Sequence, residues 1–295
     1  MSSDSHAYTN RVLKGALLLI LGETLLVIMA ALIKYSAETL PNPTIVFFRN
    51  AFGFLFLLPF LIPLGFSGLK TRVLPLHLIR SGTGIIAMYG FFYVIANAPL
   101  AQASLVKLTA PFFLPIIAYL WLSERINQRT WIAILLGFIG VTFIIQPGTD
   151  AFSWVLVLGL GAAALASMAK TTIRRMALTE PSLRVVFYFS LFTTLISAAV
   201  HCLNWVTPSH EQLAWLALTG LTGTLGQLFI TKAYQIAKPG QIGPYTYTAV
   251  LFAALFGWLF WDEPLTATVV IGSVLISFAG IINLKKPSTK AKTSG

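Results

Sequence analysis

Long apolar stretches separated by short polar breaks make up most of the chain. A bilayer core about 30 Å thick requires about 20 apolar residues for each helix that crosses it. Ten stretches meet this requirement, and Pro, Gly and Asn residues that favour turns occupy the breaks. The stretches are 13–33, 45–64, 76–96, 100–121, 130–146, 153–172, 184–204, 212–232, 240–260 and 266–284. The pattern therefore predicts an all-α integral membrane protein with ten transmembrane helices.

The basic residues test the number and direction of these helices. With the N-terminus placed in the cytoplasm, 17 of the 20 basic residues fall on the inner side, and Lys34, Arg49 and Lys107 remain. Cytoplasmic loops typically carry such an excess of Lys and Arg, and one helix more or fewer would disrupt it. Both termini are therefore expected in the cytoplasm. Three of the inner residues are expected to anchor helix ends: Arg80, Lys170 and Lys232.

Composition agrees with a lipid environment. The chain is 57% hydrophobic and 10% charged, whereas soluble domains carry about 25% charged residues. Its net charge of +11 is spread between apolar runs, without a basic patch among aromatics, so it indicates a membrane surface and not nucleic acid. The single cysteine and four scattered histidines show no spacing typical of a metal site, and His77 and His210 are expected at loop ends. The apolar run after Lys14 is too long for a signal peptide and is expected to stay as a helix.

The two halves of the chain resemble each other at a constant offset of 139 residues. Ala98–Glu124 aligns with Ala237–Glu263, and in both copies a glutamate follows a long apolar run. Each copy would contain five helices, an odd number, so the second copy would enter the membrane from the opposite side. Such inverted repeats permit alternating access, because exchanging the conformations of the halves opens one side and closes the other. Duplication for stability alone is the alternative.

Several segments carry a family resemblance. They are IVFFRNAFGFLFLLP, IRSGTGIIAMYGFFYVIANAPLAQASLVKLTAPFFLPIIAYLWLSERI, WIAILLGFIGVTFIIQPG, AYQIAKPGQIGPYTYTAVLFAALFGWLFWDEPLT and GSVLISFAGIINL. Over residues 13–285 the chain resembles the EamA-type branch of the drug/metabolite transporter superfamily. Within that branch it is similar to bacterial S-adenosylmethionine-uptake-like permeases. The resemblance implies a first repeat over 13–147 and a second over 153–285, and residues 286–295 are expected to form a disordered basic tail.

The resemblance also implies a function. It suggests a secondary active transporter that moves a small polar or amphiphilic metabolite, such as an amino acid or S-adenosylmethionine, across the inner membrane. A central cavity would lie among helices 1, 3, 4, 6, 8 and 9, with helices 5 and 10 at a dimer or peripheral face. No cofactor is expected, no ATP-binding phosphate loop occurs, and proton or substrate-exchange coupling would supply the energy. A multidrug or toxic-metabolite exporter of the same fold is the alternative. An integral membrane enzyme is a remote one, because no cluster of His, Asp or Glu occurs at one face.

Charged residues within apolar helices are the strongest candidates for binding, because charge at the bilayer centre is costly. Glu23 lies near the middle of the first helix and could bind an amino group, exchange a proton, or stay protonated in a hydrogen bond to a neighbouring helix. Lys107 lies in the outer part of the fourth helix, where it could bind a carboxylate, pair with Glu23, or extend to the surface. Lys34 and Arg49 flank the first outer loop as gate residues or headgroup anchors.

Uncharged candidates complete the predicted site. Tyr89 and Tyr93 share one face of the third helix and could stack on a planar or cationic substrate, or pack in the interior. Three further candidates for substrate binding follow in the second half: Gln227, Tyr245 and Tyr247. Three prolines within apolar helices are candidate hinges, because proline removes a helical hydrogen bond: Pro111, Pro115 and Pro244.

Overall fold

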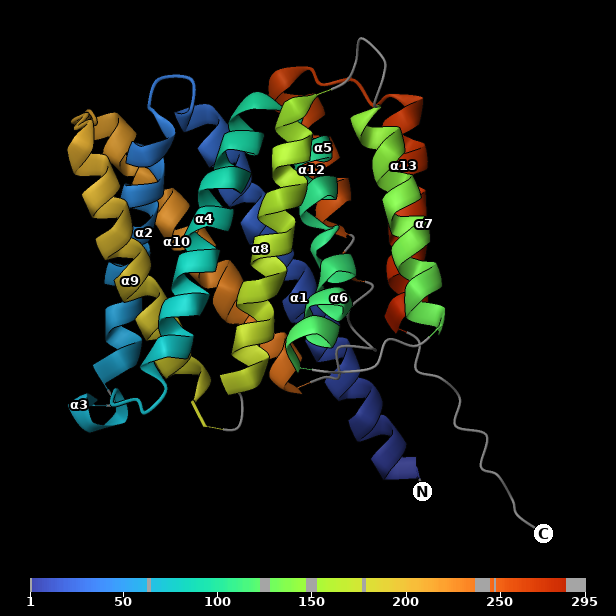
Figure 1. Ribbon diagram of the computed structural model, residues 1–295, viewed down its shortest axis with the longest axis horizontal. Coiled ribbons are helices and arrows are strands. Elements are labelled where there is room, and N and C mark those ends of the chain that lie inside the picture. The colour runs from blue at the N-terminus through green and yellow to red at the C-terminus, as the bar shows by residue number, and fades with distance from the viewer. Residues whose placement is uncertain are drawn as a thin grey trace.

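The computed structural model is a bundle of helices, without strands in the part of the chain that it describes (Figure 1). That part comprises residues 2–62, 65–122, 128–146, 153–176, 179–236, 245–246 and 248–284. The first half contains α1 (Ser2–Ser36), α2 (Asn42–Leu61), α3 (Gly65–Gly68), α4 (Leu74–Asn97), α5 (Leu100–Lys107), α6 (Ala110–Leu122) and α7 (Gln128–Ile145). The second half contains α8 (Trp154–Met176), α9 (Ser182–Leu203), α10 (His210–Ile236), α12 (Thr248–Trp261) and α13 (Ala267–Leu284).

Six of the described helices are long and apolar enough to cross a membrane. These spans are Leu13–Ser36, Asn42–Leu61, Leu74–Asn97, Trp154–Ile173, Leu183–Leu203 and His210–Ile230. Shorter apolar helices cover Ile134–Ile145, Thr248–Trp261 and Ala267–Ala279. Large apolar side chains such as Leu120, Trp154 and Leu251 are exposed on the outside of the bundle, as expected for a surface that contacts lipid.

The fourth predicted helix is broken, which corrects the sequence prediction of one helix over 100–121. α5 ends at Lys107, and α6 begins at Ala110 after a turn at Leu108 and Thr109. Pro111 follows the turn directly and has no N–H to donate to a preceding carbonyl. Hydropathy does not detect the break, because apolar residues continue through it.

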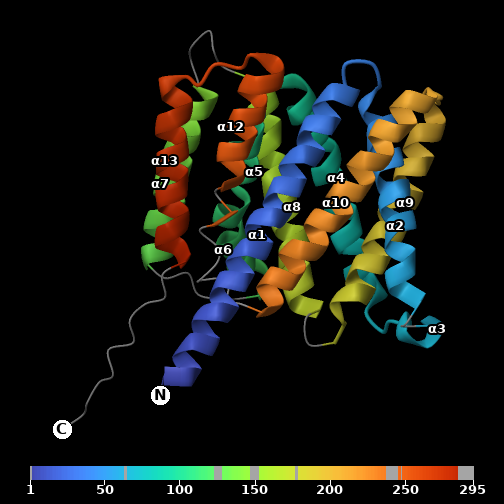
Figure 2. The ribbon, with the colours of Figure 1, turned by 180° about the vertical axis from the view of Figure 1, so that it is seen from behind.

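The helix boundaries reproduce the internal repeat. An offset of 139 places α7 (Gln128–Ile145) on 267–284, the range of α13, and places the start of α6 within one residue of the start of α12. Counterpart helices run in opposite directions: α1 rises from the lower end of the bundle in Figure 1, whereas α8 descends toward it. α1 begins and α13 ends at the same, lower end of the bundle (Figures 1 and 2).

The packing of the helices follows the same symmetry. α1 contacts α10 and α12, while its counterpart α8 contacts α4, α5 and α6. α2 contacts α10, while its counterpart α9 contacts α4, and two pairs of counterparts also meet directly, α2 with α9 and α7 with α13. The main interfaces of one half therefore have equivalents in the other, as expected for a structural repeat.

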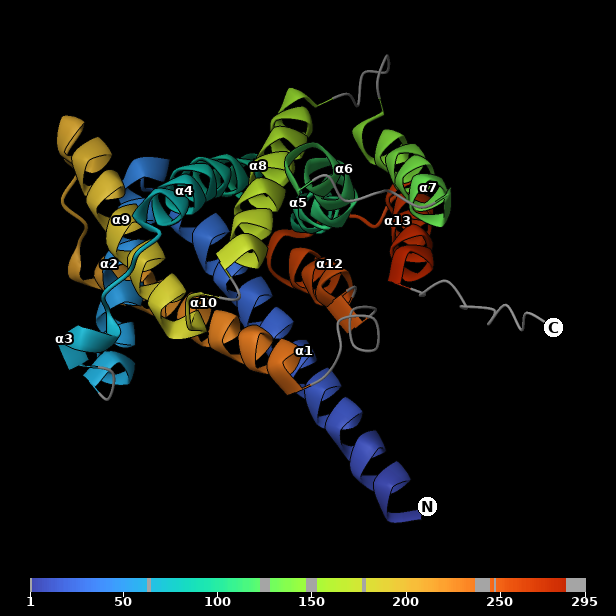
Figure 3. The same cartoon turned by 60° about the horizontal axis from the view of Figure 1, so that its bottom comes forward.

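α7 and α13 form a pair at one edge of the bundle, away from α2 and α9 (Figure 3). The pair is close because glycines face the partner backbone: a Cβ atom on Gly140 would lie 3.2 Å from the carbonyl oxygen of Gly272, and one on Gly272 would lie 2.9 Å from that of Gly140. Small residues allow such an approach between membrane helices. The edge position agrees with the peripheral place that the resemblance implies for helices 5 and 10.

Candidate functional site

The charges of three ionisable side chains from three helices act on one another. Glu23, near the middle of α1, is 7% exposed. The positive charges of Lys107, at the end of α5, and of Lys170, on α8, both act on its carboxyl group. Within the described residues Glu23 has no ion pair within 4.0 Å, so the charges face one another without contact. The predicted direct pair between Glu23 and Lys107 is therefore not formed in this conformation.

Lys170 also takes part in this group of charges, although it was not among the candidates from the sequence. Its position near the end of an apolar helix suggested an anchor at the membrane surface, but its charge acts on both Glu23 and Lys107. The Lys170 side chain itself is exposed. The neighbouring Ser167 and Thr171 are fully buried, and this polar stretch of α8 was the only available signal.

The break between α5 and α6 positions Lys107. The lysine occupies the last turn of α5, where a positive charge interacts favourably with the helix dipole. Thr109 Oγ1 donates a hydrogen bond to the carbonyl oxygen of Val106 at 2.6 Å, and Ser167 Oγ donates to that of Ala110 at 2.5 Å. These hydroxyls satisfy carbonyls near the broken helix in a region where water is scarce. Broken helices of this kind commonly form substrate sites in transporters.

Lys34 lies in the last turn of α1 and forms a contact ion pair. Its Nζ lies 2.6 Å from Oε1 of Glu263 and also donates to the carbonyl oxygen of Ala98 at 2.8 Å. Glu263 Oε2 accepts a hydrogen bond of 2.7 Å from the N–H of Leu100, at the start of α5. The Lys34 Nζ also lies 5.6 Å from the ring centroid of Trp261. These contacts, which we call the outer ion pair, join helices of both halves at the end of the bundle opposite to the start of α1.

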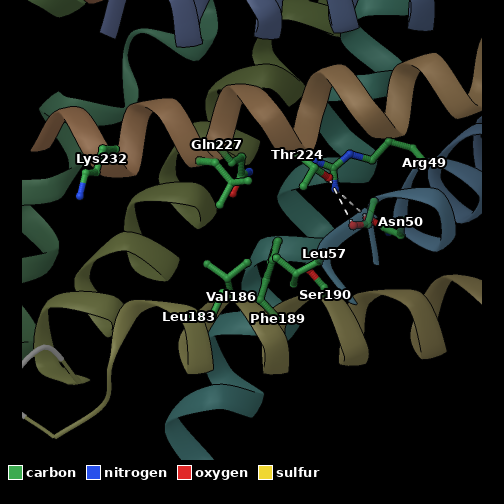
Figure 4. A pocket seen from close by; sticks show the side chains of 12 residues that line it. Arg49, Asn50, Leu57, Leu183, Val186, Phe189, Ser190, Thr224, Gln227 and Lys232 are labelled. Carbon is green, nitrogen blue, oxygen red and sulfur yellow. Dashed lines mark hydrogen bonds between the residues drawn. The ribbon is translucent and has the colours of Figure 1, made fainter. Parts of the chain in front are cut away.

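Arg49 is buried in α2, and not exposed at the outer loop as its place in the sequence suggested. It lines a cavity of about 220 Å³ between α2, α9 and α10, together with Gln227 (Figure 4). Arg49 Nη1 donates a hydrogen bond of 3.0 Å to Asn50 Oδ1, and Asn50 Nδ2 donates one of 3.3 Å to Ser197. Gly223 leaves room for the guanidinium, because a Cβ atom there would lie 3.0 Å from Arg49 Nη2.

A second buried polar group, at the lower end of the bundle, was also missed. Glu180 accepts hydrogen bonds from Thr71 at 2.9 Å and from Arg184 at 3.1 Å, and its Oε2 lies 3.5 Å from Nε2 of His77. His77 is fully buried at the start of α4. Burial opposes ionisation of Glu180, but the hydrogen bonds from Thr71 and Arg184 and the charge of Arg184 outweigh it and lower the pKa of the carboxyl. This cluster joins the segment after α3 to the start of α9.

The remaining candidates divide between interior and surface. Tyr89 packs against the apolar cluster around Ile33 and Phe92, and its hydroxyl is buried without a hydrogen bond among the described residues. Tyr93 is 44% exposed, so the two tyrosines differ in environment although they share a helix face. Tyr245 is exposed, and its carbonyl oxygen accepts a hydrogen bond from Thr248.

The hinge candidates and three other predicted features remain to be placed. Pro111 is adjacent to the helix break, and Pro115 lies inside α6. Four predicted features lie outside the described residues: Pro244, Tyr247, Glu124 and the tail 286–295. Hinge motion at the prolines stays a prediction.

Comparison with known proteins identifies the family. The sequence matches the EamA-like transporter family twice, over residues 13–146 and 153–284. The chain belongs to the EamA-like transporter family. This confirms the resemblance seen in the sequence, and with the apolar helices it makes the chain a multi-pass protein of the inner membrane. As a family member it is a transporter of small metabolites and not an enzyme.

Three curated relatives illustrate the range of the family. The pseudopaline exporter CntI of Pseudomonas aeruginosa is 32% identical, covering 90% of this chain and 94% of the relative. The S-adenosylmethionine uptake transporter of Rickettsia prowazekii is 29% identical, with 88% and 89% covered. The riboflavin transporter of Rhizobium johnstonii is 28% identical, with 94% and 92% covered. A solved crystal structure has the same fold, with a TM-score of 0.63 and 20% identity over 93% of this chain and 96% of that chain.

Proposed function

We propose that this EamA-family transporter carries a small metabolite with amino and carboxylate groups, and that Glu23, Lys107 and Lys170 bind it. The supporting observation is the set of three mutually interacting charges on α1, α5 and α8. One carboxylate and two ammonium groups complement a substrate with one amino group and one or more carboxylates. Amino acids belong to this class, and so does the amino-acid part of S-adenosylmethionine.

The charges explain why a ligand would bind there. Within the part of the chain that the structure describes, Glu23 forms no ion pair within 4.0 Å, although an ionised carboxylate in a membrane interior is costly unless it is paired. A substrate amino group would supply the partner for Glu23, and its carboxylate would neutralise a lysine. Exchange of a proton at Glu23 during the cycle would couple transport to a proton gradient, whereas substrate exchange would need no such proton.

We further infer a topology of ten membrane crossings with both termini in the cytoplasm. The segregation of basic residues supports it, and so does the place of the α1 start and the α13 end at one end of the bundle. In this orientation the outer ion pair closes the external side. Glu124 holds the sequence position in the first repeat that Glu263 holds in the second, so it is the candidate for the corresponding inner closure.

The test is uptake by purified protein in proteoliposomes, with a panel of amino acids and nucleoside-like amino acids, with and without an imposed proton gradient. Glu23→Gln, Lys107→Met and Lys170→Met should each reduce saturable flux at least about tenfold, because each removes a charge-assisted contact. Lys14→Met removes an exposed basic residue of α1 and should leave the flux unchanged. A charge exchange, Glu23→Lys with Lys107→Glu, should recover part of the lost flux.

Two results would contradict the proposal. Absence of saturable flux for every compound with amino and carboxylate groups would remove the substrate class. Transport of lipophilic cations that is indifferent to Lys107 and Lys170 would favour a multidrug exporter of the same fold.

A further inference from the structure

The cavity between α2, α9 and α10 is lined by a buried cation, Arg49, that forms no ion pair among the described residues. Arg49 is 7% exposed. Its Nη1 donates to the neutral Asn50, and its Nε is buried without a hydrogen bond among the described residues. The ion pairs found in the same part of the chain do not include Arg49. Removing one member of a buried ion pair is strongly destabilising, because the remaining charge stays desolvated. Arg49 is in this unmatched state while the cavity beside it is empty of protein atoms.

The cavity is elongated and has two chemically different ends. Arg49, Asn50, Thr224 and Ser190 form a polar end (Figure 4). Leu57 on α2 and Lys232 on α10 lie eight residues further along their helices, which corresponds to about 12 Å. Apolar side chains, among them Leu183, Val186 and Leu228, line the rest of the cavity. Lys232 itself is exposed, near the end of α10.

A second unmatched arginine lies behind one wall of the cavity. Phe189 lines the cavity, and the guanidinium carbon of Arg80 lies 4.0 Å from the centroid of its ring. Arg80 is 7% exposed, and its Nε and Nη1 have no hydrogen bond among the described residues. The positive charge of Arg80 lies behind the Phe189 ring and adds to the attraction that this wall of the cavity exerts on an anion.

We propose that this cavity is a binding site for an amphiphilic carboxylic acid, separate from the three charges around Glu23. The carboxylate would bind the guanidinium of Arg49, a planar group that suits paired hydrogen bonds to a planar acid. The apolar chain would extend along Leu57, Val186 and Leu228 toward Lys232. A phospholipid fits less well, because its headgroup stays near the membrane surface, at the level of Lys232, while Arg49 lies about 12 Å deeper along the helices.

The test is a titration of the full-length protein in phosphatidylcholine nanodiscs with sodium octanoate, followed by isothermal calorimetry. 1-Octanol is the matched ligand, because it has the same chain without the charge. Arg49→Gln should weaken octanoate binding by about tenfold to a hundredfold and leave 1-octanol binding unchanged. Val186→Trp fills the cavity while it retains the arginine, and it should abolish binding of octanoate. The control Lys14→Gln removes an exposed charge outside the cavity and should have no effect.

Each result has a definite meaning. Octanoate affinity within twofold of the wild type in both Arg49→Gln and Val186→Trp would overturn the proposal. If Arg49→Gln fails to fold, Val186→Trp still decides it, because the buried charge is then intact. Discs that contain phosphatidylglycerol should give the same octanoate affinity, and competition by that lipid would assign the site to a phospholipid instead. Loss of flux in the transport assay with normal octanoate binding would point to Glu23 and its partners, so the two proposals can fail separately.

Discussion

The outer ion pair and the cavity between α2, α9 and α10 each contain a buried basic residue, but only the first provides it with an acidic partner among the described residues. Lys34 at the outer end lies 2.6 Å from Glu263, and both side chains are mostly buried, at 14% and 12% exposure. Arg49 is buried to a similar degree, but among the described residues it donates only to the neutral Asn50. The two basic residues are therefore buried to a similar degree, but Lys34 is paired with a carboxylate and Arg49 is not paired with one among the described residues.

The difference indicates what each region is for. A matched pair stabilises the conformation in which its members meet, so the outer ion pair favours a bundle closed at that end. An unmatched charge destabilises the empty state and is compensated when an anion arrives, so it favours ligand binding. The glycine-lined space at Gly223 accommodates Arg49 without supplying an acid, which is consistent with a partner from outside the chain.

The largest effect on stability is expected from breaking the outer ion pair. Lys34→Met would leave Glu263 mostly buried and unpaired, and should lower the free energy of unfolding by about 3 kcal/mol. Chemical denaturation of purified protein in detergent, followed by tryptophan fluorescence, would measure it. The double variant with Glu263→Gln should recover part of the loss, because no charge is then left unpaired. Equal losses in the single and double variants would mean that the pair contributes little.

A smaller effect is expected at the lower end of the bundle. Glu180→Gln removes the charge that accepts hydrogen bonds from Thr71 and Arg184, and should lower the free energy of unfolding by about 2 kcal/mol at neutral pH. The pKa of Glu180 is lowered in the folded protein, from an ordinary value of 4.5. Its contribution is therefore complete above pH 4.5 and is lost as the pH falls through the folded-state pKa.

Denaturation as a function of pH tests this sign. The wild type should lose stability below pH 4.5, and the difference from Glu180→Gln should shrink there. A difference between the two proteins that stays constant from neutral pH to well below that point would contradict the assignment.

The smallest effect is expected at Arg49. Arg49→Met removes a buried charge that has no carboxylate partner among the described residues, so without ligand the free energy of unfolding should change by less than about 1 kcal/mol, or rise. The same denaturation assay applies, with Lys34→Met as the direct comparison. A loss as large as that of Lys34→Met would show that Arg49 stabilises the empty protein, and the contrast between the two regions would disappear.

The helices and their repeat were largely predictable. Bilayer thickness sets a long apolar run for each crossing, and an offset of 139 residues appears both in the sequence and in the helix boundaries of α7 and α13. The break at Leu108 and Thr109 was not predictable from hydropathy, because the segments on both sides of it are apolar. Pro111 was a candidate hinge, but a membrane helix can continue through a proline, as α6 does at Pro115.

The candidate site was predictable only in part. Glu23 and Lys107 stood out in the sequence because charge is rare in apolar helices. In the structure the positive charge of Lys107 acts on the carboxyl group of Glu23. Lys170 and Arg80 lie near helix ends, where the positive-inside rule explains a basic residue without any further role. The interaction of Lys170 with the charge of Glu23, and the contact of Arg80 with the ring of Phe189, depend on how α8 and α4 are oriented against their neighbours.

The sequence by itself determined that this protein lies in a lipid bilayer, to which family it belongs and that it contains a repeat. These properties can be read from local patterns, because hydrophobicity and turn residues act over a few neighbouring positions. Only the tertiary structure decided which charges are matched. Lys34 and Glu263 were each noticed in separate repeats, and Arg49 looked like a second residue of the same outer loop. Packing between α1, α5 and α12 brings the first two together, whereas packing of α2 against α10 buries Arg49 beside an empty cavity. Such pairings arise between residues far apart in the chain, so no local pattern encodes them.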